Sequence, residues 1–230
     1  MTVPPPGAVL GRRYPAAAFF AALDGLLTRQ LDGHPLWYAL FTCSDEVNSR
    51  VGAARQRQFG DPHGIFTTRV IGAQVFAQQV AVAAHSGHAS NVYEINIHLS
   101  LAVAGDSDCY REVIGRDGVR RAFCGALGHI LNDFRKHAAG PTAARLTDPG
   151  DLDLLGTLAA RLLPDRDAIL SAVDPFFAIT HRHLEVQVAS LAQLLRRMND
   201  LSRSDIVLGT ITWNRTEDPD LVSLELSIRV

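Results

Sequence analysis

The stretch from residue 63 to 85, HGIFTTRVIGAQVFAQQVAVAAH, constrains the fold of this chain most, because it is long, apolar and rich in alanine. Read as a strand, it leaves neither face cleanly apolar. Read as a helix, it places Ile71, Val75, Gln78 and Val82 in one row. An apolar helix of about 20 residues must be buried in a large interface. We therefore expect a buried helix over residues 65–84, although alternation also permits a strand.

Length and charge limit the class of protein. A chain of 230 residues suits one compact domain or two small ones that share a core. Its formal charge of −2 argues against a nucleic-acid binder or a membrane-surface binder, since both usually carry a basic face. No run reaches the roughly 18 apolar residues of a membrane span, and the N-terminus lacks the order of a signal peptide. We expect a cytoplasmic protein.

Hydrophobic periodicity predicts the other elements. In the first half we expect an amphipathic helix over residues 14–33, a buried strand over 35–43 and a loop over 44–62, which can hold a short helix in its middle. Segment 110–131 fits a hairpin or a helix, and both remain open. The polar linker 140–151 separates two halves, residues 1–140 and 141–230. The second half contains helices over residues 153–163 and 181–200 and a final pair of strands, 206–216 and 221–230.

Residues 91–103, NVYEINIHLSLAV, alternate strictly. Glu94, Asn96 and His98 share one face, and Tyr93, Ile95, Ile97 and Leu99 share the other. This pattern predicts a strand with one polar and one apolar face.

A similar order of features occurs in each half of the chain. A turn with His63, an apolar helix with an Ala-Gln element and alternating strands come first. A segment with His181 and His183, a second helix with Ala-Gln and the final strands follow. This order suggests a faint internal repeat.

The elements Gln74-Val75-Phe76-Ala77-Gln78 and Ala189-Ser190-Leu191-Ala192-Gln193 resemble the helix motif of hotdog-fold proteins. The chain is similar to the β-hydroxyacyl-carrier-protein dehydratases and the double-hotdog A-factor synthase family. The resemblance implies an α+β hotdog-like fold, with an antiparallel sheet wrapped around a long apolar helix, and possibly a degenerate double hotdog. It also implies a homodimer that handles an acyl thioester carried by CoA or an acyl carrier protein, as in fatty acid or polyketide biosynthesis.

The same resemblance suggests a lyase site of the dehydratase type. Dehydration of a 3-hydroxyacyl chain needs a base and an acid, usually a histidine and a carboxylate. This chain has Gln74 or Ala189 where the family has its carboxylate. Catalysis would then require His63, or His181 and His183, together with another carboxylate such as Asp45, Asp61 or Glu185. Gln74, Phe76 and Gln78 would line the acyl tunnel, or the chain would bind an acyl group without reacting it.

Cysteine and histidine spacing gives no clear metal motif. Cys43, Cys109 and Cys124 are an odd number without a CxxC pair, so we expect small buried residues. The short pairs His85/His88 and His181/His183 lack a helical HExxH motif or a cysteine partner. We therefore expect no metal and no cofactor.

A second fold stays open. If residues 65–84 and 91–103 form a hairpin, the element order looks like the T-fold of the pyruvoyl- and carboxy-tetrahydropterin synthases. Residues 127–133, LGHILND, are similar to the Leu-Asp-His element of those enzymes. That resemblance implies a pterin-like or purine-like pocket. A non-catalytic structural subunit is the third possibility.

Overall fold

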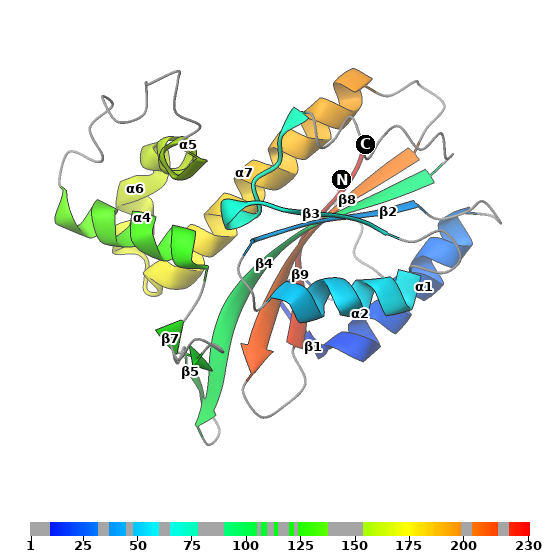
Figure 1. The fold of residues 1–230 in the computed structure, drawn as a ribbon, viewed down its shortest axis with the longest axis horizontal. Coiled ribbons are helices and arrows are strands. Elements are labelled where there is room, and N and C mark those ends of the chain that lie inside the picture. Colours follow the sequence, from blue (N-terminus) through cyan, green and yellow to red (C-terminus); the bar gives the residue numbers. More distant parts are fainter. Residues whose placement is uncertain are drawn as a thin grey trace.

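The computed structural model describes residues 10–31, 37–44, 48–59, 65–77, 90–104, 107–109, 113–114, 120–121, 124–137, 154–198, 204–215 and 221–230. One mixed β-sheet runs through these residues, and helices cover both of its faces (Figure 1). Strands from both sides of residue 140 belong to this sheet.

The sheet has a parallel centre and an antiparallel margin. Its strands follow the order β1-β9-β8-β4-β2-β3, and β5 pairs with β4. β3, β2, β4 and β8 run parallel, whereas β9 and then β1 pair antiparallel. Their bounds are β1 Arg13–Pro15, β2 Trp37–Thr42, β3 Phe66–Arg69, β4 Ser90–Ala104, β5 Ser107–Cys109, β8 Ser204–Arg215 and β9 Leu221–Arg229.

Two groups of helices sandwich the sheet (Figure 1). One face carries α1, Ala16–Leu31, and α2, Ser49–Phe59, whose buried aromatic side chains form one apolar cluster with β2 and β9. The other face carries α4 Gly125–Lys136, α5 Leu154–Leu162, α6 Arg166–Ser171 and α7 Pro175–Met198, with the short 3-10 turn η4 Leu163–Asp165 between α5 and α6. Parallel strands covered on both sides read as apolar runs, as β2 does.

Helix α7 is the long helix of the second face. It buries residues at three- and four-residue spacings, including Ile179, Leu184, Val188 and Leu191, against β4 and β8. Basic residues in its last turn complement the helix dipole. The helix predicted over residues 181–200 is confirmed, but it begins earlier, at Pro175.

The hotdog-like fold is wrong, including its double form. Residues Phe66–Arg69 form β3, which pairs in parallel with β2, and a 3-10 turn, η2 Ile71–Ala73, follows directly. Gly72 has a φ of 66° and Ala73 a φ of 54°, which no α-helix accommodates. The predicted helix therefore does not run through residues 66–76, and residues 78–84 lie outside the described part of the chain.

The T-fold alternative is also wrong. It required residues 65–84 to pair with β4, but β2 lies between β3 and β4. Both readings of segment 110–131 are partly confirmed, since a short pair, β6 Val113–Ile114 and β7 Arg120–Arg121, precedes α4. The short helix that the sequence allowed within the loop at residues 44–62 is present as α2.

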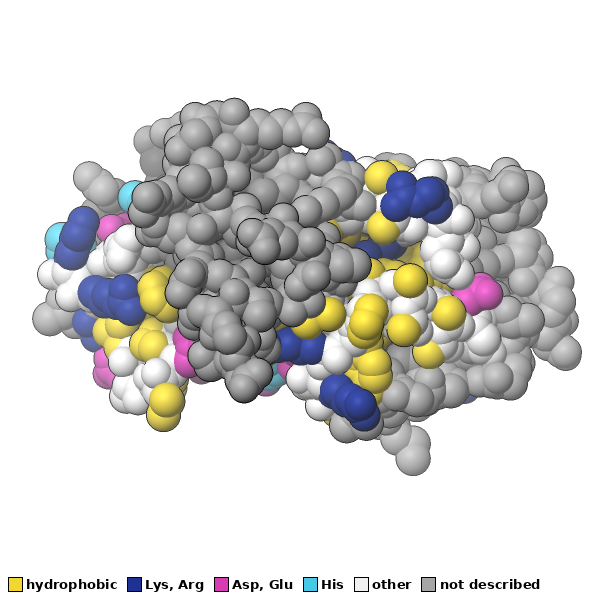
Figure 2. Space-filling view, turned by 90° about the horizontal axis from the view of Figure 1, so that it is seen from below, with side chains coloured by type: hydrophobic (Ala, Val, Ile, Leu, Met, Phe, Trp, Pro, Cys, Tyr) yellow, Lys and Arg dark blue, Asp and Glu magenta, His cyan; other side chains and the backbone are white. Residues whose placement is uncertain are grey.

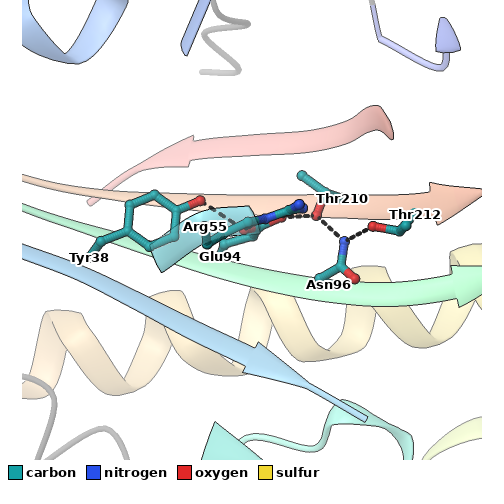
Figure 3. A network of polar contacts seen from close by, with 6 residues as sticks. All are labelled: Tyr38, Arg55, Glu94, Asn96, Thr210 and Thr212. Carbon is teal, nitrogen blue, oxygen red and sulfur yellow. Dashed lines mark hydrogen bonds and ion pairs between the residues drawn. The ribbon is translucent and has the colours of Figure 1, made fainter. Parts of the chain in front are cut away.

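The strand predicted over residues 91–103 is confirmed as β4, but its polar face is buried. Figure 3 shows the hydrogen bonds that Glu94 and Asn96 of this face form. The Glu94 carboxylate accepts hydrogen bonds from Tyr38 at 2.7 Å, from Arg55 Nε at 2.9 Å and Nη2 at 2.7 Å, and from Thr210. Asn96 donates to Thr210 and Thr212 at 2.8 Å each. The network ties α2 to three neighbouring strands.

The face that carries α1 and α2 shows mixed chemistry. On the described part of this face, Lys and Arg side chains are separated by hydrophobic and uncharged ones (Figure 2). Across the described ranges, no helix combines the length and the hydropathy that crossing a membrane requires.

Candidate functional site

The candidate site lies at the carboxyl ends of the parallel strands β2 and β3. Thr42 ends β2, and backbone bonds join the two strand ends: Val70 N–H donates to Thr42 O at 3.1 Å and Ser44 N–H to Val70 O at 3.2 Å. In parallel α/β sheets, ligands bind outside the carboxyl ends of the strands. Cys43, the first residue after β2, occupies this edge.

Two cysteines meet there. The Sγ atoms of Cys43 and Cys124 lie 3.4 Å apart, although 81 residues separate them in the sequence. Neither cysteine forms a disulfide, and both are buried. The distance exceeds the roughly 2.05 Å of a disulfide. It is close to the roughly 3.8 Å that separates two sulfurs bound tetrahedrally to one Zn²⁺.

The electrostatics of the pair favour a bound cation. The facing thiol of Cys43, and then burial, raise the pKa of Cys124 well above its usual value. Backbone N–H groups of Leu127 and Ala126, in the first turn of α4, lower the pKa of Cys124 to a smaller extent. Two buried thiolates repel each other without a cation, whereas a metal ion deprotonates coordinating thiols. The pair therefore fits a soft divalent metal such as zinc.

Asn48 links a buried histidine to the Cys43 backbone. Its Nδ2 donates to Cys43 O at 3.2 Å and lies 3.1 Å from His98 Nδ1. β2 and β4 pair in parallel, with Thr42 opposite Asn96, so His98 lies level with the chain just beyond Cys43. Within the ranges that the structure describes, however, no three His, Cys, Asp or Glu residues converge closely enough to hold a metal.

A second buried histidine reaches the site from α7. His183 Nε2 donates to Gly72 O, and Gly72 N–H in turn donates to Cys43 Sγ at 3.3 Å. Burial lowers the pKa of His183 to about 4, so the ring is neutral at pH 7. Gln187, one turn further along α7, accepts from Val75 N–H at 2.9 Å.

The predicted site residues do not form one site. His183 and Gln74 are buried near the η2 turn, where Gln74 Nε2 donates to Ile71 O at 3.2 Å and Leu154 O at 2.8 Å. Phe76 is partly buried beyond the same turn. His63, Asp45 and Gln78 lie outside the described residues, as do His85, His88 and Asp61.

His181 and Glu185 lie elsewhere on α7. His181 is 30% exposed and approaches Glu185 at 3.6 Å and Glu225 of β9 at 3.8 Å. Glu185 also accepts from Arg182 at 2.9 Å. Residues two apart on a helix point in different directions, so His181 and His183 do not act as a pair.

Sequence reasoning missed the role of the two cysteines. It placed Cys43 and Cys124 correctly as buried residues. The available signal was the position of Cys43 at the end of an apolar strand with Asp45 two residues later. Nothing in the sequence indicated that Cys124 would meet it.

The chain shares its architecture with solved structures of the limiting CO2-inducible protein LCIB and its homologs. The chain is similar to PtLCIB4, a homolog of the limiting CO2-inducible protein LCIB, with 20% identity, a TM-score of 0.72, and coverage of 94% of this chain and 90% of that one. The H88A mutant of PtLCIB4 gives 17% identity and a TM-score of 0.73, covering 94% and 89%. LCIB itself has 16% identity to this chain and a TM-score of 0.68, and the match covers 95% of this chain and 93% of LCIB. These likenesses show a shared fold.

A family model identifies the chain more specifically. No curated protein matches it. The model of the limiting CO2-inducible proteins B/C beta carbonic anhydrases matches residues 22–225. This match overturns the resemblance to hotdog dehydratases, the acyl-thioester function with its lyase and fatty-acid context, and the pterin-synthase alternative. The chain belongs to the family of the limiting CO2-inducible proteins B/C beta carbonic anhydrases.

Proposed function

We propose that this protein is a zinc-dependent carbonic anhydrase, which converts CO2 and water into bicarbonate and a proton. The observation that carries the proposal is the pair of buried cysteines Cys43 and Cys124, which form no disulfide and whose sulfurs lie 3.4 Å apart at the carboxyl end of β2. The family description supplies the reaction. Catalytic zinc sites use three protein ligands, and two cysteines with one histidine is a known set.

The described residues supply two ligands, Cys43 and Cys124, and a third would have to come from outside the described ranges. His98 is not that ligand: β2 and β4 pair with Thr42 opposite Asn96, so Cys43 lies level with Ile97 and shares its face of the sheet, while His98 belongs to the opposite face with Glu94 and Asn96. His183 is not a ligand either, because its Nε2 is already bonded to Gly72. Zinc held at the cysteine pair would supply a Lewis acid that lowers the pKa of bound water to about 7.

The chain supplies the remaining chemistry. The thiols belong to the same buried apolar cluster as Ile97, Leu99 and Leu127, which restricts water and strengthens electrostatic interactions in the site. Asp45 follows Cys43 by two residues, so covalent geometry alone limits the distance between their Cα atoms to about 7 Å. A carboxylate at that distance can accept or orient a proton. We propose Asp45 for this role.

The test compares zinc content and CO2 hydration in purified variants. We expect Cys43→Ser and Cys124→Ser to lose stoichiometric zinc, measured by elemental analysis, and to lose hydration activity, measured by stopped-flow pH change. Cys109→Ser is the matched control and should retain both. Full zinc and activity in Cys124→Ser would refute the proposed centre.

Two further statements stay predictions from the sequence. Light scattering would test the expected homodimer. Cell fractionation would test the expected cytoplasmic location.

A further inference from the structure

We propose that His183 and Gln187 of α7 are positioning residues for the metal centre. They hold the loop after β3 so that the Gly72 N–H group donates to the sulfur of Cys43. This inference rests on the proposed function in one respect, namely that a metal binds at Cys43. It concerns the affinity for that metal and not the catalytic step.

A continuous series of hydrogen bonds connects α7 to the thiol. His183 Nε2 donates to Gly72 O, and Gly72 N–H donates to Cys43 Sγ at 3.3 Å. One helical turn further on, Gln187 Oε1 accepts from Val75 N–H at 2.9 Å. Residues spaced four apart lie on the same helix face, so both side chains hold the same loop.

The loop conformation needs this support. Gly72, with φ of 66°, and Ala73, with φ of 54°, are consecutive residues in the left-handed region. For Ala73 this conformation is unfavourable, because its Cβ comes too close to the following carbonyl oxygen. Such conformations persist where surrounding contacts over-determine them. The direction in which Gly72 presents its N–H to Cys43 is therefore maintained by the bonds from α7 together with one bond within the loop, from Ala73 N–H to Val70 O at 2.8 Å.

The protonation of His183 suits the same role. Because Nε2 donates to a carbonyl oxygen, Nε2 carries the proton, and the neutral ring leaves Nδ1 as an acceptor. Nδ1 is buried and has no hydrogen-bond partner among the described residues. Burial, with Arg161 nearby, keeps the ring uncharged at pH 7 and therefore adds no positive charge beside a metal.

A donated N–H group stabilises a thiolate and so favours metal binding. Outer partners of metal ligands typically change metal affinity 10–100-fold when they are removed. We expect His183→Leu, which loses the donor to Gly72, to bind Zn²⁺ at least 10-fold more weakly. Gln187→Met, which loses the acceptor for Val75, should weaken binding in the same direction by a smaller factor.

The experiment uses the full chain and Zn²⁺ or Co²⁺ as the probe. Competition with a chromophoric chelator gives Zn²⁺ affinity, and the thiolate-to-Co²⁺ charge-transfer band reports the sulfur directly. His183→Gln is the conservative variant, because its side-chain N–H can still reach Gly72. Thr180→Val is the control: Thr180 is equally buried on α7, but its hydroxyl donates to Phe176 O at 2.8 Å, within the helix.

The expected result is weaker Zn²⁺ binding and a shifted charge-transfer band in His183→Leu, recovery in His183→Gln, and wild-type values in Thr180→Val. If His183→Leu does not fold, Gln187→Met gives the decision. The inference is overturned by unchanged affinity and band in His183→Leu, by equal weakening in Thr180→Val, or by failure of the wild-type protein to bind Zn²⁺. A zinc-loaded wild type without CO2 hydration would refute the proposed function alone, and the affinities would still decide the role of His183.

Discussion

Replacement of Arg55 by methionine tests how much Arg55 contributes to stability within the buried polar network on β4. Arg55 is 1% exposed and Glu94 is fully buried, and the guanidinium donates two hydrogen bonds to the carboxylate. Arg55 also lies over the Phe20 ring, 3.9 Å from its centroid. Methionine keeps most of the apolar volume of the side chain but removes the charge and both donors.

The expected destabilisation follows from the remaining contacts. Removing one partner of a buried ion pair costs about 3–5 kcal/mol, because the other charge stays buried. Tyr38 and Thr210 still donate to Glu94, so we expect the lower end, about 3 kcal/mol. A domain of this kind has a free energy of unfolding of about 5–15 kcal/mol. Arg55→Met should therefore fold, but its urea midpoint should be lower than that of the wild type.

The pH dependence makes the test more specific. In the wild type, burial tends to raise the pKa of Glu94, but Arg55, Thr210 and Tyr38 outweigh it and hold the pKa below its usual value. This contribution to stability is present above the unfolded pKa of about 4.3 and is lost as the pH falls through the folded pKa. Without Arg55, burial raises the pKa of Glu94. The folded variant then gains a proton before the unfolded chain, and its deficit shrinks on acidification.

Urea unfolding followed by tryptophan fluorescence at pH 7 and pH 5 measures both effects. Arg57→Met, at an exposed position on the same helix, is the matched control and should change stability by less than about 0.5 kcal/mol. A loss below about 1 kcal/mol in Arg55→Met, the range of an exposed pair, would refute the reasoning. So would a deficit that is equal at both pH values.

Three other substitutions test separate parts of the structure. Gly72→Ala should lower the melting temperature and weaken Zn²⁺ binding, because φ is 66° and the new Cβ would lie 2.6 Å from Leu158 Cδ2; unchanged melting would contradict the loop conformation. Tyr38→Phe should cost about 1–3 kcal/mol in urea unfolding, because Glu94 loses a 2.7 Å donor, and a neutral result would show that this bond adds nothing. His181→Gln should change stability by less than about 1 kcal/mol, since its ion pairs are partly exposed and long, and a loss above about 2 kcal/mol would contradict that assessment.

Local patterns in the sequence predicted elements well where packing agreed with them. The amphipathic helix at the N-terminus, the apolar strand that ends before Cys43 and the alternating strand that contains Glu94 all occur as α1, β2 and β4. Periodicity indicates these elements because each buries a face that repeats with the period of its backbone. It indicated a long helix wrongly at residues 66–76, because alanine and valine recur there with helical spacing while two left-handed residues interrupt the chain.

Burial of polar residues could not be predicted from alternation. Glu94 and Asn96 belong to the polar row of the alternating strand, yet both are fully buried, because α2 brings Arg55 over the same face. The sequence separation of 39 residues between Arg55 and Glu94 carries no local signal. The order of the strands was equally hidden, since β4 lies between β2 and β8 although β3 precedes it in the chain.

The sequence by itself determined the elements with one clear period and the burial of Cys43 and Cys124, because hydrophobicity and spacing act over a few residues. Only the tertiary structure brought the sulfurs of those two cysteines together. Parallel strands require long crossovers, so residues at their carboxyl ends come from distant parts of the chain, and here 81 residues separate two sulfurs 3.4 Å apart. His183 reaches the same place from α7, 111 residues away from the glycine that it holds. Such contacts depend on how the helices pack across the sheet.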